Sequence, residues 1–279
     1  MTLSVFLAVI LAAFLHASWN VLVKFNLDRF LSLFLLQTLM GFMGLGMLVF
    51  FAWPAKAALP FALTSGLLHT GYNLFLARSY KSGDLSVVYP VARGTAPFIT
   101  LIGSAMFSHD AISTVAIIGI LILIAGIWLI ALGPSHGLKT DRTTLLFALG
   151  TSVFIGCYTI VDGLGGRASG NASGYTGLVF VLDAIGIVTA GLYLRGPAIF
   201  KTVLPFWRSG LFGAAASGCA YWIVIWAMSV APIAMVAALR ETSILFAIGL
   251  SAKVLNEKLN VSRIVGALLV VVGAIALRA

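Results

Sequence analysis

Two arginines lie inside hydrophobic stretches of the sequence, where charged side chains are rare. Arg93 and Arg240 each sit near the middle of a long apolar run. An arginine at the centre of a membrane costs about 2.5–3.5 kcal/mol on insertion scales, so it normally faces a wet cavity or a partner. Two guanidinium groups in one cavity could hold an anion through paired hydrogen bonds. In the structural alternative, Glu241 neutralises Arg240. Arg93 is then neutralised by Asp162 or Asp183 of another helix.

A second polar pattern occurs twice in the sequence. A histidine, an aromatic residue and an asparagine follow one another at i, i+3 and i+4, as His16, Trp19 and Asn20 and again as His69, Tyr72 and Asn73. Residues at this spacing share one face of a helix. A lone histidine in a membrane helix usually makes an interhelical hydrogen bond, but the repeated stripe favours two faces that line a cavity.

Other polar and aromatic side chains are candidates for the remaining walls of such a cavity. Tyr89 precedes Arg93 by four residues and therefore shares its helix face. Tyr158, Tyr221 and Trp222 could complete the site, or they could serve in packing and as interfacial anchors, which is the commoner use of aromatic residues. Candidate groups for proton coupling are Glu241, Asp162, Asp183, His16 and His69. We expect no metal site and no cofactor.

The composition indicates that these residues lie within a lipid membrane. Hydrophobic residues make up 61% of the 279 residues, charged residues 9%, and the mean hydropathy is +1.10. A soluble domain has about 25% charged residues. The net charge of +9 comes from bases between apolar runs, which is typical of membrane topology signals rather than of nucleic-acid binding. We therefore expect an all-α integral membrane protein with lipid, and no nucleic acid, around it.

Ten apolar runs of about 20 residues, the length that spans a bilayer, follow one another along the chain. They cover residues 3–24, 30–52, 59–80, 84–107, 111–132, 144–163, 174–194, 210–230, 232–254 and 259–278. The longest connections, Gly133–Thr143 and Arg195–Ser209, are expected to be short basic loops. The odd-numbered loops carry most of the Lys and Arg residues, including Arg29, which predicts that these loops are cytoplasmic and both termini are outside.

The second half of the chain repeats the first. The stretch 84–132 aligns with 231–279 without a gap, and its identical pairs include Arg93 with Arg240, Thr95 with Thr242, Ser104 with Ser251, Gly119 with Gly266 and Gly126 with Gly273. Two halves of five spans each follow, and an odd number of spans inverts the second half relative to the first. Many transporters use inverted repeats to build two related conformations around a site at the membrane midplane.

Several motifs resemble those of the drug/metabolite transporter superfamily with two EamA domains. They are His16-Ala-Ser-Trp-Asn20, Gly83-Asp-Leu-Ser-Val-Val-Tyr-Pro90, Leu255-Asn-Glu-Lys-Leu-Asn260 and Gly266-Ala-Leu-Leu269. The resemblance covers essentially the whole chain and implies ten helices and alternating access. It places the first repeat at residues 1–133, a linker at 134–143 and the inverted second repeat at 144–279. It also implies, against the loop charges, that both termini are often cytosolic.

The pattern as a whole predicts a secondary transporter and not an enzyme. We expect it to move a small polar metabolite, anionic if the arginines face the cavity, across a bacterial cytoplasmic membrane, with H⁺ as a candidate coupling ion. An exporter of amino acids, amines or drugs is the second interpretation. A membrane enzyme or lipid-linked-sugar subunit is the third, but no His-Glu-x-x-His, Gly-x-Ser-x-Gly or paired-aspartate motif occurs in the sequence.

Overall fold

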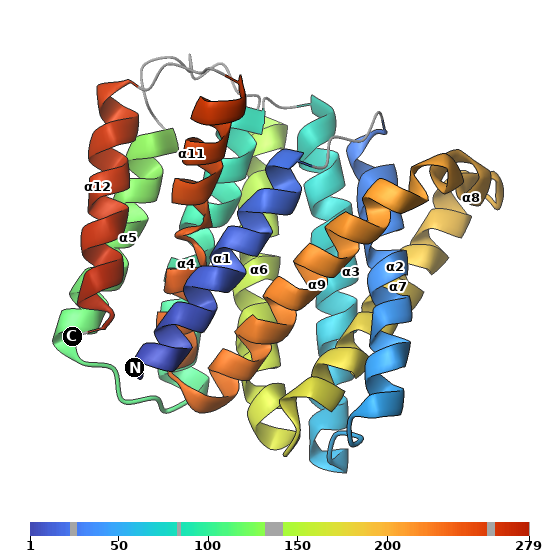
Figure 1. Cartoon of the computed structure of the whole chain (residues 1–279), viewed down its shortest axis with the longest axis horizontal. Coiled ribbons are helices and arrows are strands. Elements are labelled where there is room, and N and C mark those ends of the chain that lie inside the picture. The colour runs from blue at the N-terminus through green and yellow to red at the C-terminus, as the bar shows by residue number, and fades with distance from the viewer. Residues whose placement is uncertain (23–26, 83–84, 132–141, 256–259, 279) are drawn as a thin grey trace.

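The apolar runs fold into a bundle of helices in a computed structural model of the chain (Figure 1). The structure describes residues 1–22, 27–82, 85–131, 142–255 and 260–278, with side chains over 1–20, 27–79, 91–130, 142–250 and 260–278. The helices are α1 (Leu3–Leu22), α2 (Arg29–Phe50), η1 (Lys56–Ala58), α3 (Leu59–Ser82), α4 (Leu85–Phe107), α5 (Thr114–Ala131), α6 (Arg142–Ala168), α7 (Ala172–Arg195), α8 (Ala198–Val203), η2 (Leu204–Phe206), α9 (Trp207–Val230), α10 (Ile233–Arg240), α11 (Ser243–Leu255) and α12 (Val261–Ala276). The described part of the chain contains no strand, as the sequence predicted.

Two predicted boundaries are wrong. The expected loop Arg195–Ser209 contains α8 and η2 and the first residues of α9. The ninth apolar run is interrupted at Glu241, where the helical hydrogen bonds shorten from i→i−4 to i→i−3: Glu241 N donates to Ala238 O at 3.0 Å and Ile244 N to Glu241 O at 3.1 Å. A hydropathy count does not detect such a local tightening, because it is computed from side chains and not from backbone hydrogen bonds.

The outside of the bundle suits a lipid environment. Large hydrophobic side chains are exposed on it, including Phe50 at 86% and Val49 at 79%. Six helical segments of the described chain are long and apolar enough to span a membrane, and three more are apolar but shorter. Helix α3 is in neither group because it carries polar residues such as His69, Asn73 and Arg78. The chain is thus a multi-pass membrane protein, and the number ten stays a prediction.

Helices of one half of the chain pack against helices of the other half. Helix α5 packs against α12 and α2 against α7, each beside its counterpart in the other half. The contact of α3 with α6 has its counterpart in the contact of α9 with α1, and that of α4 with α6 in that of α11 with α1. Both chain ends lie on the same, lower side in Figure 1. The interior of the bundle is therefore an interface between the two halves.

Glycines allow the last helix of each half to approach the other closely. A Cβ added to Gly126 of α5 would lie 2.7 Å from the backbone oxygen of Gly266 of α12, and one on Gly273 would lie 2.6 Å from the oxygen of Gly119. Real side chains do not reach such distances, so the two backbones must separate if a side chain is introduced.

Replacing Gly126 with leucine is therefore expected to destabilise the protein by about 1–3 kcal/mol, the usual cost of overpacking. The measurement is the unfolding temperature of the purified protein in detergent. The matched control is Gly46→Leu in α2, because a Cβ there meets no atom within 4 Å. Equal melting temperatures for the two variants would contradict the predicted close contact.

Candidate functional site

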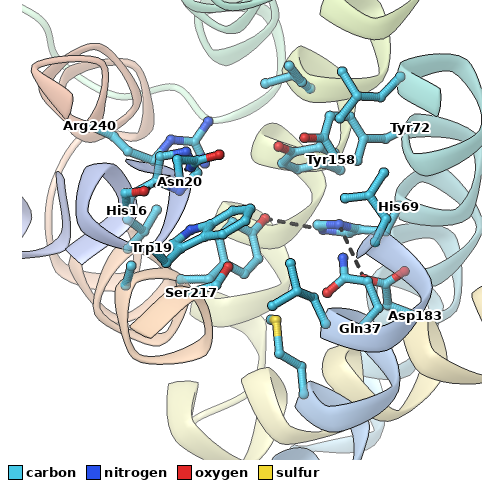
Figure 2. Close-up of a pocket in the computed structure, with 18 of the residues that line it drawn as sticks. His16, Trp19, Asn20, Gln37, His69, Tyr72, Tyr158, Asp183, Ser217 and Arg240 are labelled. Atoms are coloured by element: carbon cyan, nitrogen blue, oxygen red, sulfur yellow. Dashed lines mark hydrogen bonds and ion pairs between the residues drawn. The ribbon is translucent and has the colours of Figure 1, made fainter. Parts of the chain in front are cut away.

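A cavity of about 100 Å³ opens between the two halves of the bundle (Figure 2). Its lining comes from α1, α2, α3, α4, α6, α7, α9 and α10. The lining residues occupy the second half of α1 and the first half of α2. The cavity therefore extends from the middle of the bundle toward the side away from the chain ends in Figure 1.

One wall of the cavity is basic. Arg93 Nε lies 2.8 Å from Glu241 Oε2, and Arg240 Nη2 lies 3.5 Å from Glu241 Oε1. All three side chains are buried. The two repeat-related arginines thus share one carboxylate, which leaves one positive charge in excess among these three side chains. The alternative in which Asp162 or Asp183 pairs with Arg93 is wrong, because the turn at Glu241 brings that residue to α4.

His16 and its neighbours continue the basic wall along α1. Asn20 Nδ2 donates to His16 O at 2.8 Å, and the rings of His16 and Trp19 meet edge to face at 5.8 Å. In Figure 2 these side chains lie with Arg240 and Ser217 on one side of the cavity. Their grouping follows from the i, i+3, i+4 spacing on one helix.

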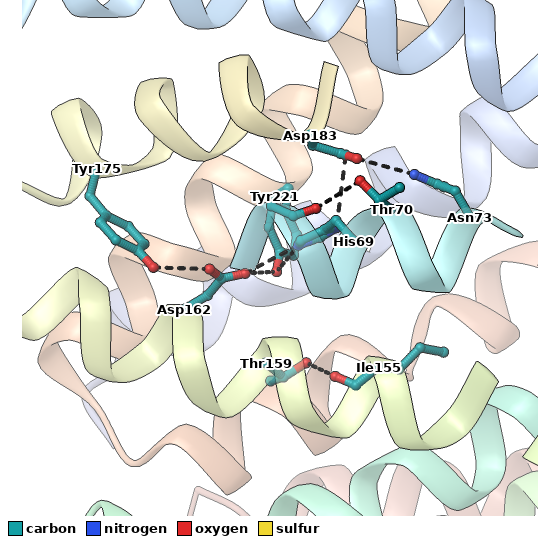
Figure 3. A network of polar contacts seen from close by, with 10 residues as sticks. His69, Thr70, Asn73, Ile155, Thr159, Asp162, Tyr175, Asp183 and Tyr221 are labelled. Atoms are coloured by element: carbon teal, nitrogen blue, oxygen red, sulfur yellow. Dashed lines mark hydrogen bonds and ion pairs between the residues drawn. The ribbon is translucent and has the colours of Figure 1, made fainter. Parts of the chain in front are cut away.

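The opposite wall is acidic and aromatic. His69 Nε2 lies 3.2 Å from Asp162 Oδ2, and His69 Nδ1 lies 3.9 Å from Asp183 Oδ2. The ring of Tyr158 stacks on His69 with centroids 4.1 Å apart. Asn73 Nδ2 donates to Asp183 Oδ1 at 3.1 Å. Figure 3 shows this network between α3, α6, α7 and α9.

The structure brings most of the candidate residues to this one cavity. Those that line it are His16, Trp19, Asn20, His69, Tyr72, Arg93, Tyr158, Asp183, Tyr221 and Arg240. Asn73, Asp162 and Glu241 lie just behind the lining, in contact with residues of the wall. Trp222 is elsewhere: its Nε1 donates to Ser173 Oγ at 2.9 Å, and its ring packs on Phe51. The side chain of Tyr89 lies outside the described residues.

Several lining residues were not predicted. Arg29 lines the cavity from the first turn of α2, although its position before an apolar run predicted a basic residue in a connecting loop. Gln37 follows it on the same helix and is one of few polar residues in that apolar run. Arg29 and Gln37 are eight residues apart, which places them on one helix face. This spacing could have identified the shared helix face from the sequence. Ser217 and Thr151 gave no comparable signal.

The side of the bundle near the chain ends is closed by a salt bridge between the halves. Arg167, at the end of α6, donates from Nη1 and Nη2 to the two oxygens of Asp110 at 2.7 and 3.0 Å. Arg167 also donates to the carbonyls of Met228 and Ala231, and Asp110 accepts the backbone N–H of Ile233 at 2.9 Å. Three connecting regions are thereby held together.

The hydrogen-bond donors around Asp110 favour the charged form of its carboxyl group. Partial burial raises the pKa of the Asp110 carboxyl, but hydrogen bonds from Arg167, Ile233 N–H and Ser108 outweigh it and hold that pKa below its ordinary value. A carboxyl group whose pKa is lower in the folded state stabilises the protein at pH values above its unfolded-state pKa. This contribution is lost as the pH falls through the folded-state pKa. The contribution is therefore complete at neutral pH and disappears only in acid, below the ordinary value of 3.8.

Replacing Asp110 with asparagine is expected to lower the stability at pH 7 by about 1–3 kcal/mol, the range for losing charge-assisted hydrogen bonds. Thermal unfolding in detergent measures this loss. Because the neutral amide does not titrate, the difference between variant and wild type is expected to shrink as the pH falls below 3.8 and to vanish below the lowered folded-state pKa. A difference that persists there would contradict the assigned charge.

The comparisons with known proteins agree with this architecture. The model of the EamA-like transporter family matches the chain twice, over residues 3–132 and 142–279. None of the curated protein sequences compared matches significantly. Among 29 solved chains that match, one described as "Crystal structure of protein" has a TM-score of 0.77 and 16% identity over 99% of this chain and 96% of its own. At that identity the likeness shows the fold alone.

Proposed function

Because the chain belongs to the EamA-like transporter family, we propose that it is a secondary transporter of a small polar metabolite that carries an anionic group. The proposed location is a bacterial cytoplasmic membrane. Transport would proceed by alternating access of the cavity between the two halves, since inverted repeats supply two related conformations of one site. The proposed substrate class depends on the basic wall, and the proposed mechanism depends on the repeats.

One observation carries the anion proposal: Arg240 lines the cavity while only partly neutralised. Its nearest carboxylate, Glu241, lies 3.5 Å away and also binds Arg93. The Nε of Arg240 is buried and meets no hydrogen-bond acceptor among the described residues. A buried guanidinium group with an unused donor is costly, and a carboxylate or phosphate accepts from it in the planar geometry that arginine offers.

A second candidate substrate class rests on Asp183. This carboxylate lines the wall opposite Arg240, so the cavity has a basic and an acidic side (Figure 2). A substrate with both an anionic and an ammonium group, such as an amino acid, would match the two walls. Both candidate substrate classes would use the basic wall. They differ in whether Asp183 binds an ammonium group of the substrate.

The proposal can be tested on the purified protein in proteoliposomes. Uptake of radiolabelled acetate, inorganic phosphate and methylphosphonate is measured beside that of glucose and choline. We expect saturable uptake of at least one anion and none of glucose or choline, because the basic wall carries the excess charge. Uptake of choline alone, with no anion transported, would contradict the anion proposal. An amino acid such as glycine serves as the probe for the second candidate.

A further inference from the structure

A chain of titratable groups runs from the cavity into the protein through α3, α6 and α7. Asp183 and His69 line the cavity, whereas Asp162 lies behind them and is fully buried. His69 stands between the two carboxylates, 3.2 Å from Asp162 and 3.9 Å from Asp183. Figure 3 shows the three side chains in this order. A proton in the cavity can therefore reach the histidine without crossing an apolar layer.

The two carboxylates have too little positive charge around them. Over the described side chains, His69 is the one basic group within ion-pair distance of either Asp162 or Asp183. Even a protonated His69 balances only one of two negative charges. Burying an uncompensated carboxylate in a membrane interior is expensive. The cluster therefore requires one more cation when both carboxylates are ionised.

Both oxygens of Asp162 accept hydrogen bonds. Tyr221 donates to its Oδ2 at 2.5 Å and Tyr175 to its Oδ1 at 3.1 Å, and His69 Nε2 approaches Oδ2 as well. A carboxylate stripped of its proton only accepts hydrogen bonds, so these donors all suit the charged form. The two oxygens of Asp162 are thus already engaged by tyrosine donors, whereas Asp183 accepts from one described side chain, Asn73.

The orientation of His69 leaves a vacant position for a proton. When the neutral imidazole carries its hydrogen on Nε2, that nitrogen donates to Asp162, 3.2 Å away, and Nδ1 has a free lone pair. Its Nδ1 lone pair then faces an oxygen of Asp183 at 3.9 Å. Two lone pairs opposite one another repel. One proton placed on either atom turns this repulsion into attraction and also neutralises one charge of the cluster.

The other groups that face this pair are the tyrosines of the acidic wall and the distant basic wall. Tyr158 of α6 stacks on His69, and Tyr221 of α9 meets it edge to face. Tyr72 contacts Tyr158, and Tyr175 reaches only Asp162. Arg240 of α10 lines the opposite wall of the same cavity. From α2, the uncharged Gln37 lies beside Asp183 in Figure 2, and Arg29 lines the same cavity.

We propose that His69 and Asp183 together hold one exchangeable proton that serves as the coupling ion of transport, with Asp162 as the hydrogen-bonded neighbour of His69. The role of this proton in coupling rests on the proposed transport function, whereas the proton site itself does not. Arg240 links the two sites electrostatically, since an anion bound to it removes the positive charge that disfavours the proton. Substrate and proton would then bind more tightly together than separately.

The proton site can be tested without a substrate. In protein labelled with ¹⁵N-histidine and kept in lipid nanodiscs, the His69 ring signal is identified by its loss in the His69→Gln variant. Between pH 5 and 9 we expect the Nδ1 signal to shift as one proton is gained or lost. Asp183→Asn should remove this shift, and Asp183→Glu should restore it. Asp28→Asn, which changes an exposed carboxylate, is the matched control and should leave it unchanged.

Coupling is measured separately in proteoliposomes that contain a pH-sensitive dye. A gradient of whichever anion gives uptake, among acetate, phosphate and methylphosphonate, should move protons in the wild type and in Asp28→Asn. In Asp183→Asn, proton movement should be lost, and Asp183→Glu should restore it. A histidine signal that keeps its shift in Asp183→Asn would overturn the proton site. So would methylammonium binding that requires Asp183 and moves no proton. A normal histidine shift without transport of any probe would instead refute the proposed function.

Discussion

Replacing Arg240 with alanine is expected to weaken the binding of the transported anion about 10–100-fold, because one or two charge-assisted hydrogen bonds of about 1.5–3 kcal/mol are lost. The residue lines the cavity and has a buried donor with no acceptor among the described atoms. The dissociation constant is measured by thermal shift in a concentration series of the anion, since a ligand stabilises the folded state it binds. Uptake by proteoliposomes should fall in parallel.

Two further variants make this result specific. Arg240→Lys keeps the charge but loses the planar pair of donors, so we expect intermediate affinity. Arg195→Ala removes an exposed arginine that pairs with Asp28 near the end of α7, and it should leave affinity unchanged. Unchanged affinity for every transported anion in Arg240→Ala would remove the basis for an anionic substrate.

Replacing Glu241 with glutamine is expected to destabilise the protein by about 3 kcal/mol, because removing one partner of a buried ion pair leaves the other charge uncompensated. Glu241 accepts from Arg93 Nε at 2.8 Å and is the carboxylate nearest to Arg240. The unfolding temperature in detergent reports this loss. A second expected effect is faster unfolding of the turn between α10 and α11, visible as increased hydrogen exchange of that segment.

The matched control exchanges the same chemical groups at the surface. Asp28 forms an exposed ion pair with Arg195 and caps α2 by accepting from Leu31 N. Asparagine retains the cap, so Asp28→Asn loses only the exposed pair and should cost less than about 1 kcal/mol. Adding Arg93→Gln to the Glu241→Gln variant should recover part of its stability. A double variant less stable than Glu241→Gln alone would contradict the assigned ion pair.

The sequence predicted most of the fold because the signals are strong and local. Apolar runs long enough for a bilayer predicted the helices to within a few residues. The close approach of Gly126 to Gly266 was not predicted, because the repeat relates Gly126 to Gly273 and does not say which helices meet. The sequence did not predict the interruption at Glu241 or the helix Ala198–Val203, because a hydropathy pattern does not report backbone hydrogen bonding. Both depend on backbone hydrogen bonds that tertiary packing selects.

The site was predicted less completely. Helical spacing correctly grouped His16 with Trp19 and Asn20, since that relation is local to one helix. Which helices face one another is not local. Thus Glu241 pairs with Arg93 and Asp162 with His69, although the sequence offered Asp162 as a partner for Arg93. Arg29 was missed because a basic residue beside an apolar run resembles a topology signal.

The most direct test of the account is the accessibility of the cavity from the two sides of the membrane. Ser217 lines the cavity and is replaced with cysteine in a chain whose two natural cysteines, Cys157 and Cys219, are changed to serine. A membrane-impermeant maleimide is applied to one side of oriented vesicles, and separately to the other. Alternating access predicts labelling from both sides, slowed in each case by the transported anion. Labelling from one side alone, with transport intact, would contradict it.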